Sequence, residues 1–110
     1  MSFMNRANSA LEGLPLEELA AFCRRHHIRE LAVFGSILGP GFTANSDVDF
    51  LATLEPHVRI PMSRLLAIEE ELAAIVGRRV DLVLRPSLLR SKNILRKQAI
   101  LESAQVLYAA

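Results

Sequence analysis

Residues 31–54 read LAVFGSILGPGFTANSDVDFLATL, and this stretch decides the fold. Its two apolar runs, residues 31–34 and 48–54, are each expected to form a buried strand. The intervening residues 36–46 contain a Gly-Pro-Gly triplet and an Asn-Ser pair, which are typical of a loop. The stretch therefore predicts two strands of one sheet, with a glycine at the end of the first strand and acidic residues at the start of the second.

The flanking sequence supplies helices and a third strand. Apolar residues at helical intervals predict helices over residues 15–25, 61–76 and 88–103. A short apolar run predicts the third strand over residues 80–84. Residues 106–108 either extend the last helix or form a short edge strand.

The order of these elements predicts an α+β fold, with a small mixed β-sheet and helices packed against it. The length of 110 residues and the mass of 12.2 kDa fit one domain. We assign that domain to residues 14–110 and expect residues 1–13 to be a loose N-terminal segment.

The composition argues against several classes of protein. No apolar run approaches the roughly 18 residues of a membrane helix, and no secretory signal is evident. Cys23 is the single cysteine, which excludes an intrachain disulfide and favours a cytoplasmic location. A net charge of +1 argues against a general nucleic-acid binder. The apolar fraction of 51% predicts an exposed apolar patch, outside the sheet core, that a protein partner covers.

The Gly35-Ser36 pair at the end of the first strand is a candidate phosphate site. A glycine at such a turn lets the backbone approach a ligand closely. Exposed amide groups and the Ser36 hydroxyl would then face a phosphate.

Three aspartates are candidate metal ligands. Asp47 and Asp49 are two residues apart at a strand start, so both carboxylates point to one face. Such a pair repels unless a cation neutralises it, and oxygen ligands suit Mg²⁺, with Mn²⁺ as an alternative. Asp81, inside the third strand, faces the same cleft if that strand lies beside the second. The alternative is an ordinary turn with acids that blunt a strand edge, and a buried Asp81 argues against it.

At these residues the chain resembles the DNA polymerase β-like nucleotidyltransferase superfamily. Its signature is Gly-Ser, ten residues, Asp-x-Asp and a later strand aspartate, and the small size points to the minimal nucleotidyltransferase (MNT) branch. The resemblance runs from about Leu16 to Tyr108. It rests on the segments LAVFGSILG, NSDVDFLATLEP, LLAIEEELAAIVGRRVDLVL and ILESAQVLYA.

The resemblance implies an antitoxin encoded beside a HEPN-domain ribonuclease toxin. Members of the branch transfer AMP from ATP to a toxin tyrosine near the ribonuclease site. Carried over by motif, Gly35 and Ser36 would hold the nucleotide phosphates, and Asp47 and Asp49 would bind magnesium. Asp81 would be the third carboxylate, which binds metal and holds or deprotonates the attacking hydroxyl.

One departure from the family pattern lies in the turn. Relatives often carry a basic residue shortly after Gly-Ser, whereas this chain has no Lys or Arg between Ser36 and Asp49. The basic segment from Arg85 to Lys97 could supply the missing phosphate contact, or it could be a solvated helix face.

Two further functions are compatible with the sequence. The protein could neutralise the toxin by binding alone, or it could transfer a nucleotide to RNA or to a small molecule. The absence of an accessory domain for a nucleic-acid primer favours a protein acceptor, and the chain could assemble with itself or with its partner.

The remaining polar residues are expected to be structural. We interpret Cys23 as a buried apolar residue, and His26-His27 as cations at a helix C-terminus. Glu69-Glu70-Glu71 and Arg78-Arg79 are interpreted as solvated surface charges.

Overall fold

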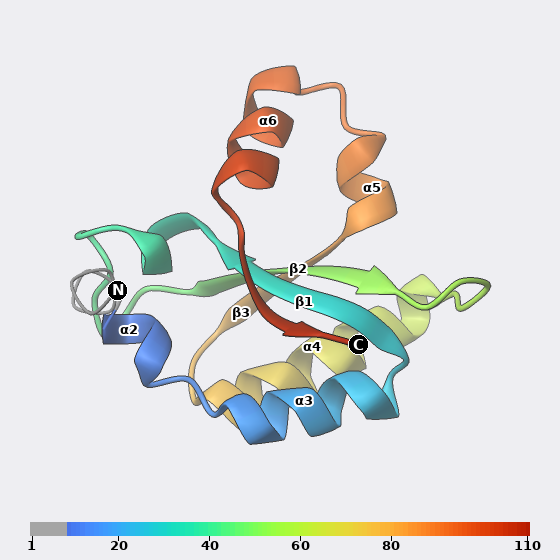
Figure 1. Cartoon of the computed structure of the whole chain (residues 1–110), viewed down its shortest axis with the longest axis horizontal. Coiled ribbons are helices and arrows are strands. Elements are labelled where there is room, and N and C mark those ends of the chain that lie inside the picture. Colours follow the sequence, from blue (N-terminus) through green and yellow to red (C-terminus); the bar gives the residue numbers. More distant parts are fainter. Residues whose placement is uncertain (1–8) are drawn as a thin grey trace.

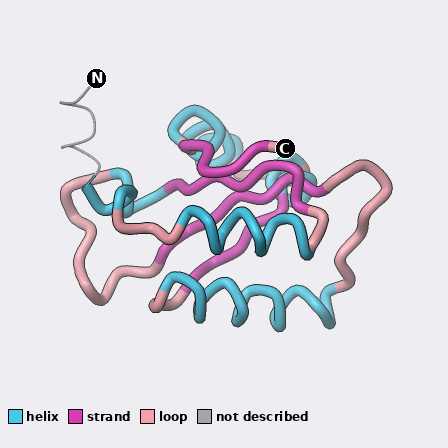
Figure 2. Tube along the Cα trace, turned by 60° about the horizontal axis from the view of Figure 1, so that its bottom comes forward, coloured by secondary structure: helices cyan, strands magenta, loops and turns pink. Residues whose placement is uncertain are grey.

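The computed structural model describes residues 9–110 as one four-stranded sheet with helices on both faces. Helices α3 and α4 lie along one face, and α5 and α6 lie over the other (Figures 1 and 2). The helices are α2 (Ser9–Glu12), α3 (Leu16–Arg25), η1 (Gly35–Leu38, a 3₁₀ turn), α4 (Met62–Val76), α5 (Arg85–Leu89) and α6 (Ile94–Ser103). The strands are β1 (Ile28–Phe34), β2 (Val48–Leu54), β3 (Val80–Leu84) and β4 (Gln105–Ala109).

The sheet is mixed, as the sequence predicts. Its strand order is β3-β2-β1-β4, with β1 antiparallel to β2 and β4 and with β2 parallel to β3. Helix α4 connects the two parallel strands, which require a long crossover between them. The chain then crosses the sheet from β3 at one edge to β4 at the other, and α5 and α6 form this crossing (Figure 1).

Side chains that alternate along the central strands point to opposite faces of the sheet and contribute to two separate hydrophobic cores. The larger core lies between the sheet and helices α3 and α4. The smaller core lies between the sheet and helices α5 and α6. The smaller core consists of Ala32, Phe34, Leu51, Leu88 and Ile100. Because side chains alternate along a strand, this second face also receives the odd-numbered residues at the start of β2.

The helix boundaries follow the local sequence. Pro15 and Pro61 directly precede α3 and α4, where the missing N–H of proline costs no helical hydrogen bond. Gly77 ends α4 in the left-handed conformation, at φ 76°, and its N–H donates to the carbonyl of Ala73. Both long helices therefore begin and end close to where the sequence predicts.

The prediction of one continuous helix over residues 88–103 is wrong. The structure has two helices, α5 and α6, separated by residues 90–93. The Asn93 side chain accepts a hydrogen bond from Arg96 N and so caps the start of α6. Residues 106–108 belong to edge strand β4, which is the second of the two alternatives. The strand predicted over residues 31–34 begins earlier, at Ile28.

The N-terminal segment predicted to be loose lies mostly outside the described residues. Of its described part, Ser9–Glu12 forms the one-turn helix α2, and Ala10 and Leu11 pack against the larger core. Cys23 is fully buried in the same core, and burial raises the pKa of its thiol to about 12. In residues 9–110, no helix has the length and apolar character needed to cross a bilayer.

Candidate functional site

The Gly35-Ser36 turn lies at the end of β1 and begins the 3₁₀ turn η1. Gly35 has φ +82°, a left-handed conformation that strongly favours glycine. Both Gly35 and Ser36 are exposed, whereas Ile37 is buried in the larger core and anchors the turn. The Ser36 carbonyl accepts a hydrogen bond from Gly39 N at 3.0 Å, which closes the turn. The Ser36 side chain is thus left at the surface on a fixed backbone.

The side chain of Asp49 lies directly over this turn. A Cβ built on Gly35 would collide with Asp49 Oδ2, so no side chain fits at position 35 without displacing that carboxylate. The proximity follows from sheet register, because Phe34, the last residue of β1, pairs with Asp49 on β2. The glycine that the sequence assigns to phosphate binding therefore also makes room for an acidic group.

Asp49 and Asp81 are direct partners across the parallel strands β2 and β3. Both belong to the face covered by α5 and α6, and Asp47 precedes Asp49 by two residues at the start of β2. Burial raises the pKa of Asp49, and the charges of Asp81 and Asp47 raise it further. The other two predicted carboxylates therefore lie near enough for their charges to act on Asp49.

Asp81 is exposed, which contradicts the expectation that it is buried. Its strand is at the edge of the sheet, and its side chain is on the face that the short helices cover only in part. Asp81 is therefore not a buried acid, although its predicted position beside β2 is correct.

The donor set suits magnesium, but the carboxylates are not gathered into a complete chelate. Within residues 9–110, no group of three His, Cys, Asp or Glu side chains is close enough to hold a metal ion. Mg²⁺ commonly binds one or two carboxylates and completes its octahedron with substrate phosphates and water. The adjacent oxygen donors of Asp49 and Asp81, with the Gly35-Ser36 turn beside them, fit such a shared site.

Two arginines that the sequence marked as simple surface charges contact the loop before β2. The Arg79 Nε lies 3.2 Å from Asp47 Oδ1. Arg78 Nη1 donates to the carbonyls of Thr43 and Ser46, each at 2.9 Å. The Arg78 guanidinium also stacks over the Phe42 ring, 4.4 Å from its centroid. Arg78 thus fixes the loop that delivers Asp47 and Asp49.

Glu69 and Glu71 on α4 are not merely solvated, as the sequence suggested. Glu69 Oε2 accepts a hydrogen bond of 2.8 Å from Leu82 N, the backbone amide that follows Asp81. Glu71 bonds to Arg25 and, at 2.8 Å, to His26, and it thereby joins α4 to the end of α3. Neither contact follows from sequence spacing, because each joins segments that are far apart in the chain.

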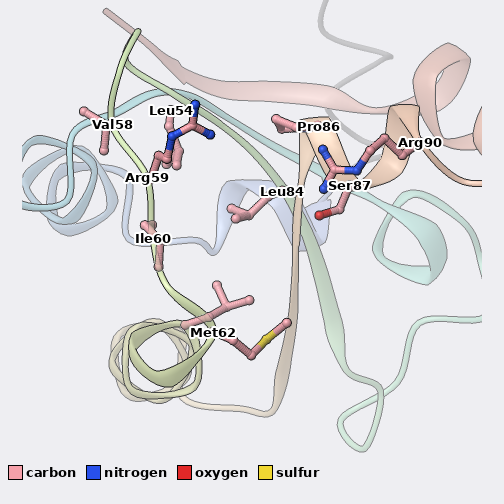
Figure 3. A pocket seen from close by; sticks show the side chains of 10 residues that line it. Leu54, Val58, Arg59, Ile60, Met62, Leu84, Pro86, Ser87 and Arg90 are labelled. Atoms are coloured by element: carbon pink, nitrogen blue, oxygen red, sulfur yellow. The ribbon is translucent and has the colours of Figure 1, made fainter.

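One hollow lies away from the carboxylates, at the other end of β2 and β3. It has a volume of about 320 Å³, and Leu54 and Leu84, the last residues of these strands, contribute to its walls. Arg59 and Arg90 approach it from opposite sides (Figure 3). A second hollow of about 240 Å³ adjoins the carboxylate end and is lined by Asp47, Glu69 and Arg79 among others.

Comparison with known proteins identifies the family. The nucleotidyltransferase domain family matches residues 16–107. Over 95 residues the chain is 36% identical to the protein adenylyltransferase MntA of Thermococcus cleftensis, covering 76% of this chain and 93% of that protein. The chain therefore belongs to the nucleotidyltransferases. Within them it belongs to the same family as the protein adenylyltransferase MntA.

Solved structures show the same fold. A chain of a toxin–antitoxin complex with AMP-PNP matches with a TM-score of 0.68 at 19% identity, covering 88% of this chain and 75% of that chain. A chain of the complex between tri-AMPylated HEPN toxin of Shewanella oneidensis and MNT antitoxin matches with a TM-score of 0.61 at 16% identity. That second match covers 86% of this chain and 70% of the other.

Proposed function

We propose that this protein is an antitoxin that transfers AMP from ATP to a tyrosine of a cognate HEPN ribonuclease toxin and thereby neutralises it. The observation that carries the proposal is the juxtaposition of Asp49 with both Asp81 and the Gly35 turn. A relative that is a protein adenylyltransferase, and structural neighbours that contain AMP-PNP or an AMPylated HEPN toxin, support the choice of reaction and partner.

The residues have distinct roles in this proposal. The Gly35 and Ser36 amides and the Ser36 hydroxyl bind the nucleotide phosphates. Asp49 and Asp81, with Asp47 two residues before Asp49, would hold Mg²⁺ together with the nucleotide phosphates. The ion would supply neutralisation of the phosphate charge and a lower pKa for the acceptor hydroxyl. The hydroxyl oxygen attacks the α-phosphorus, the bond to pyrophosphate breaks, and Asp81 accepts the hydroxyl proton. Asp81 suits this task because it is exposed to an incoming acceptor.

An exposed apolar surface supports a protein acceptor. Large apolar side chains on α5 and α6 are solvent-exposed, with Leu95 at 80% and Ile94 at 62%, and with Leu89 at 51%. These helices cover the sheet face to which Asp49 and Asp81 belong. A toxin that docks on this surface therefore binds on the same side of the sheet as the carboxylates. ATP as the co-substrate also favours a cytoplasmic location.

The test is to incubate the protein with ATP, magnesium and the HEPN protein encoded by the neighbouring gene. We expect an adenylyl mass increase on a tyrosine of the HEPN protein and loss of its ribonuclease activity. The Asp47→Asn, Asp49→Asn double variant should bind the toxin but transfer no AMP. A wild-type protein that folds and binds the toxin without modifying it contradicts the catalytic role.

A second function, neutralisation by binding alone, is favoured by the turn that lacks a basic residue. The same double variant distinguishes the two functions. If it still neutralises the toxin at the same dose as the wild type, covering the toxin suffices and AMP transfer is dispensable.

A further inference from the structure

The phosphate site lacks a cation within its own turn, so any basic group must come from another element. No Lys or Arg lies between Ser36 and Asp49. Arg78 and Arg79 are near the site but already engaged. Arg78 holds two carbonyls of the preceding loop and the Phe42 ring, and Arg79 pairs with Asp47.

Arg96 is placed on the carboxylate face by the packing of α6. Four residues further along this helix, Ile100 is buried in the smaller core together with Phe34. Residues four apart share one side of a helix, so Arg96 is on the same side of α6 as Ile100, one turn nearer the start of the helix. Phe34 in turn directly precedes Gly35 and pairs with Asp49. The Asn93 cap at Arg96 N fixes the helical turn that carries this side chain.

The electrostatics of the site agree with this placement. Burial and the two neighbouring aspartates raise the pKa of Asp49, and Arg96 is the cation that opposes them and lowers it. Among residues 9–110, no carboxylate forms an ion pair with Arg96 within 4.0 Å. The guanidinium is exposed and therefore available to a ligand.

We infer that Arg96 binds the polyphosphate of the nucleotide and replaces, from α6, the basic residue that the Gly35-Ser36 turn lacks. The inference rests on the proposed function, since it names a binding residue of the same site. A planar guanidinium with several N–H donors suits two phosphate oxygens at once. A residue on α6 also makes phosphate binding depend on the α5–α6 crossing, and not only on the turn.

The experiment measures nucleotide binding without any toxin. Equilibrium binding of ATP with magnesium, and of adenosine, is compared for the wild type, Arg96→Gln, Arg96→Lys and the control Lys92→Gln. Lys92 is exposed between α5 and α6, and its replacement removes the same charge from the same segment. We expect Arg96→Gln to weaken ATP binding by about tenfold to a hundredfold, with adenosine binding unchanged. Arg96→Lys should recover part of the loss, and Lys92→Gln should bind ATP like the wild type.

A purely structural role of Arg96 would weaken adenosine as much as ATP and would lower the unfolding temperature. That result, or ATP binding by Arg96→Gln equal to that of the wild type, overturns the inference. The variant Arg79→Gln tests the nearest competitor, and a loss of ATP binding there but not in Arg96→Gln also overturns it. If the wild type binds ATP through Arg96 but modifies no toxin, the proposed function fails and the inference stands. A wild type that binds no ATP overturns both.

Discussion

Replacement of Gly35 by alanine tests whether this position makes room for the Asp49 carboxylate. The new Cβ meets two obstacles. The backbone has φ +82°, where an L-residue is strained, and the position of the Cβ is occupied by Asp49 Oδ2. The carboxylate is the end of a short side chain, so it can move, but only by leaving the place where Asp81 and the turn meet it.

The backbone strain is expected to lower the stability of the protein, whereas the collision with Asp49 is expected to lower the rate of AMP transfer. Left-handed backbone costs an L-residue about 1–2 kcal/mol, which lowers the Tm of a domain of this size by roughly 4–16 °C. Displacement of a catalytic group by about 1 Å can cost a hundredfold in rate. Gly35→Ala is thus expected to lose a modest part of its stability and at least about a hundredfold of AMP transfer.

Gly77→Ala is the matched control for the backbone effect. Gly77 has φ +76°, but nothing lies within 4 Å of an added Cβ, so alanine meets the strain without the collision. Gly41→Ala meets neither obstacle, because its φ is not positive and its Cβ position is open. Thermal unfolding and the rate of AMP transfer to the toxin should be measured for all three variants.

Comparison of the three variants shows whether the collision with Asp49, and not the backbone strain, lowers the transfer rate. Gly77→Ala should lose stability but keep its transfer rate, and Gly41→Ala should match the wild type in both. If Gly35→Ala transfers AMP as fast as Gly77→Ala, the Asp49 carboxylate does not depend on the space above Gly35, and the reasoning fails.

Three further predictions concern ionisable groups. Burial and the neighbouring aspartates raise the pKa of Asp49 from 3.8, so the folded state favours the neutral form of this side chain. The resulting stabilisation is present below pH 3.8 and is lost as the pH rises through the folded-state pKa. Asp49→Asn should therefore raise the free energy of unfolding at pH 7 by about 1 kcal/mol, measured by urea unfolding, and a decrease would contradict the repulsion. For Glu71 the pH dependence of stability has the opposite sign, because the hydrogen bond from Arg25 leads the causes that lower its pKa below 4.5. The stabilising contribution of Glu71 is present above pH 4.5 and is lost as the pH falls through the folded-state pKa. Glu71→Gln should lower the free energy of unfolding by no more than about 1 kcal/mol at pH 7, since the carboxylate is 36% exposed. Below about pH 4.5, the free energy of unfolding of this variant should fall less steeply with decreasing pH than that of the wild type. Cys23, with its pKa near 12, should resist alkylation in the folded protein at pH 8 and react in denaturant, and rapid native labelling would show that the thiol is accessible.

The sequence predicts the local elements of this fold well where apolar runs have clear ends. Strands β2 and β3 begin and end at the residues expected, since acids, arginines or prolines flank them. The sequence does not reveal the break between α5 and α6, because residues 88–103 contain no glycine or proline that would end a helix. Their separation into two helices follows from the need to cross the sheet, which is a property of the whole fold.

The residues of the candidate site likewise fall into those that the sequence predicts and those that only the fold reveals. The motif identifies Gly35, Ser36 and the three aspartates, and period-2 geometry explains why Asp47 and Asp49 share a face. The contact of Arg78 with Phe42 and the position of Arg96 near Asp49 depend on how distant elements pack. Nothing in the spacing of these residues reveals such contacts, so the sequence could give only a basic segment without a target.

The hydrogen bond from Leu82 N to Glu69 has a consequence for self-association. β3 is an edge strand, and an exposed edge offers unpaired amides to which a strand of another molecule can add. Glu69 accepts a hydrogen bond from one of these amides, Leu82 N, at the middle of the strand. A charged side chain at this position disfavours a continuous intermolecular sheet. The edge beside the carboxylates is thereby protected from aggregation, while the acids themselves stay open to solvent.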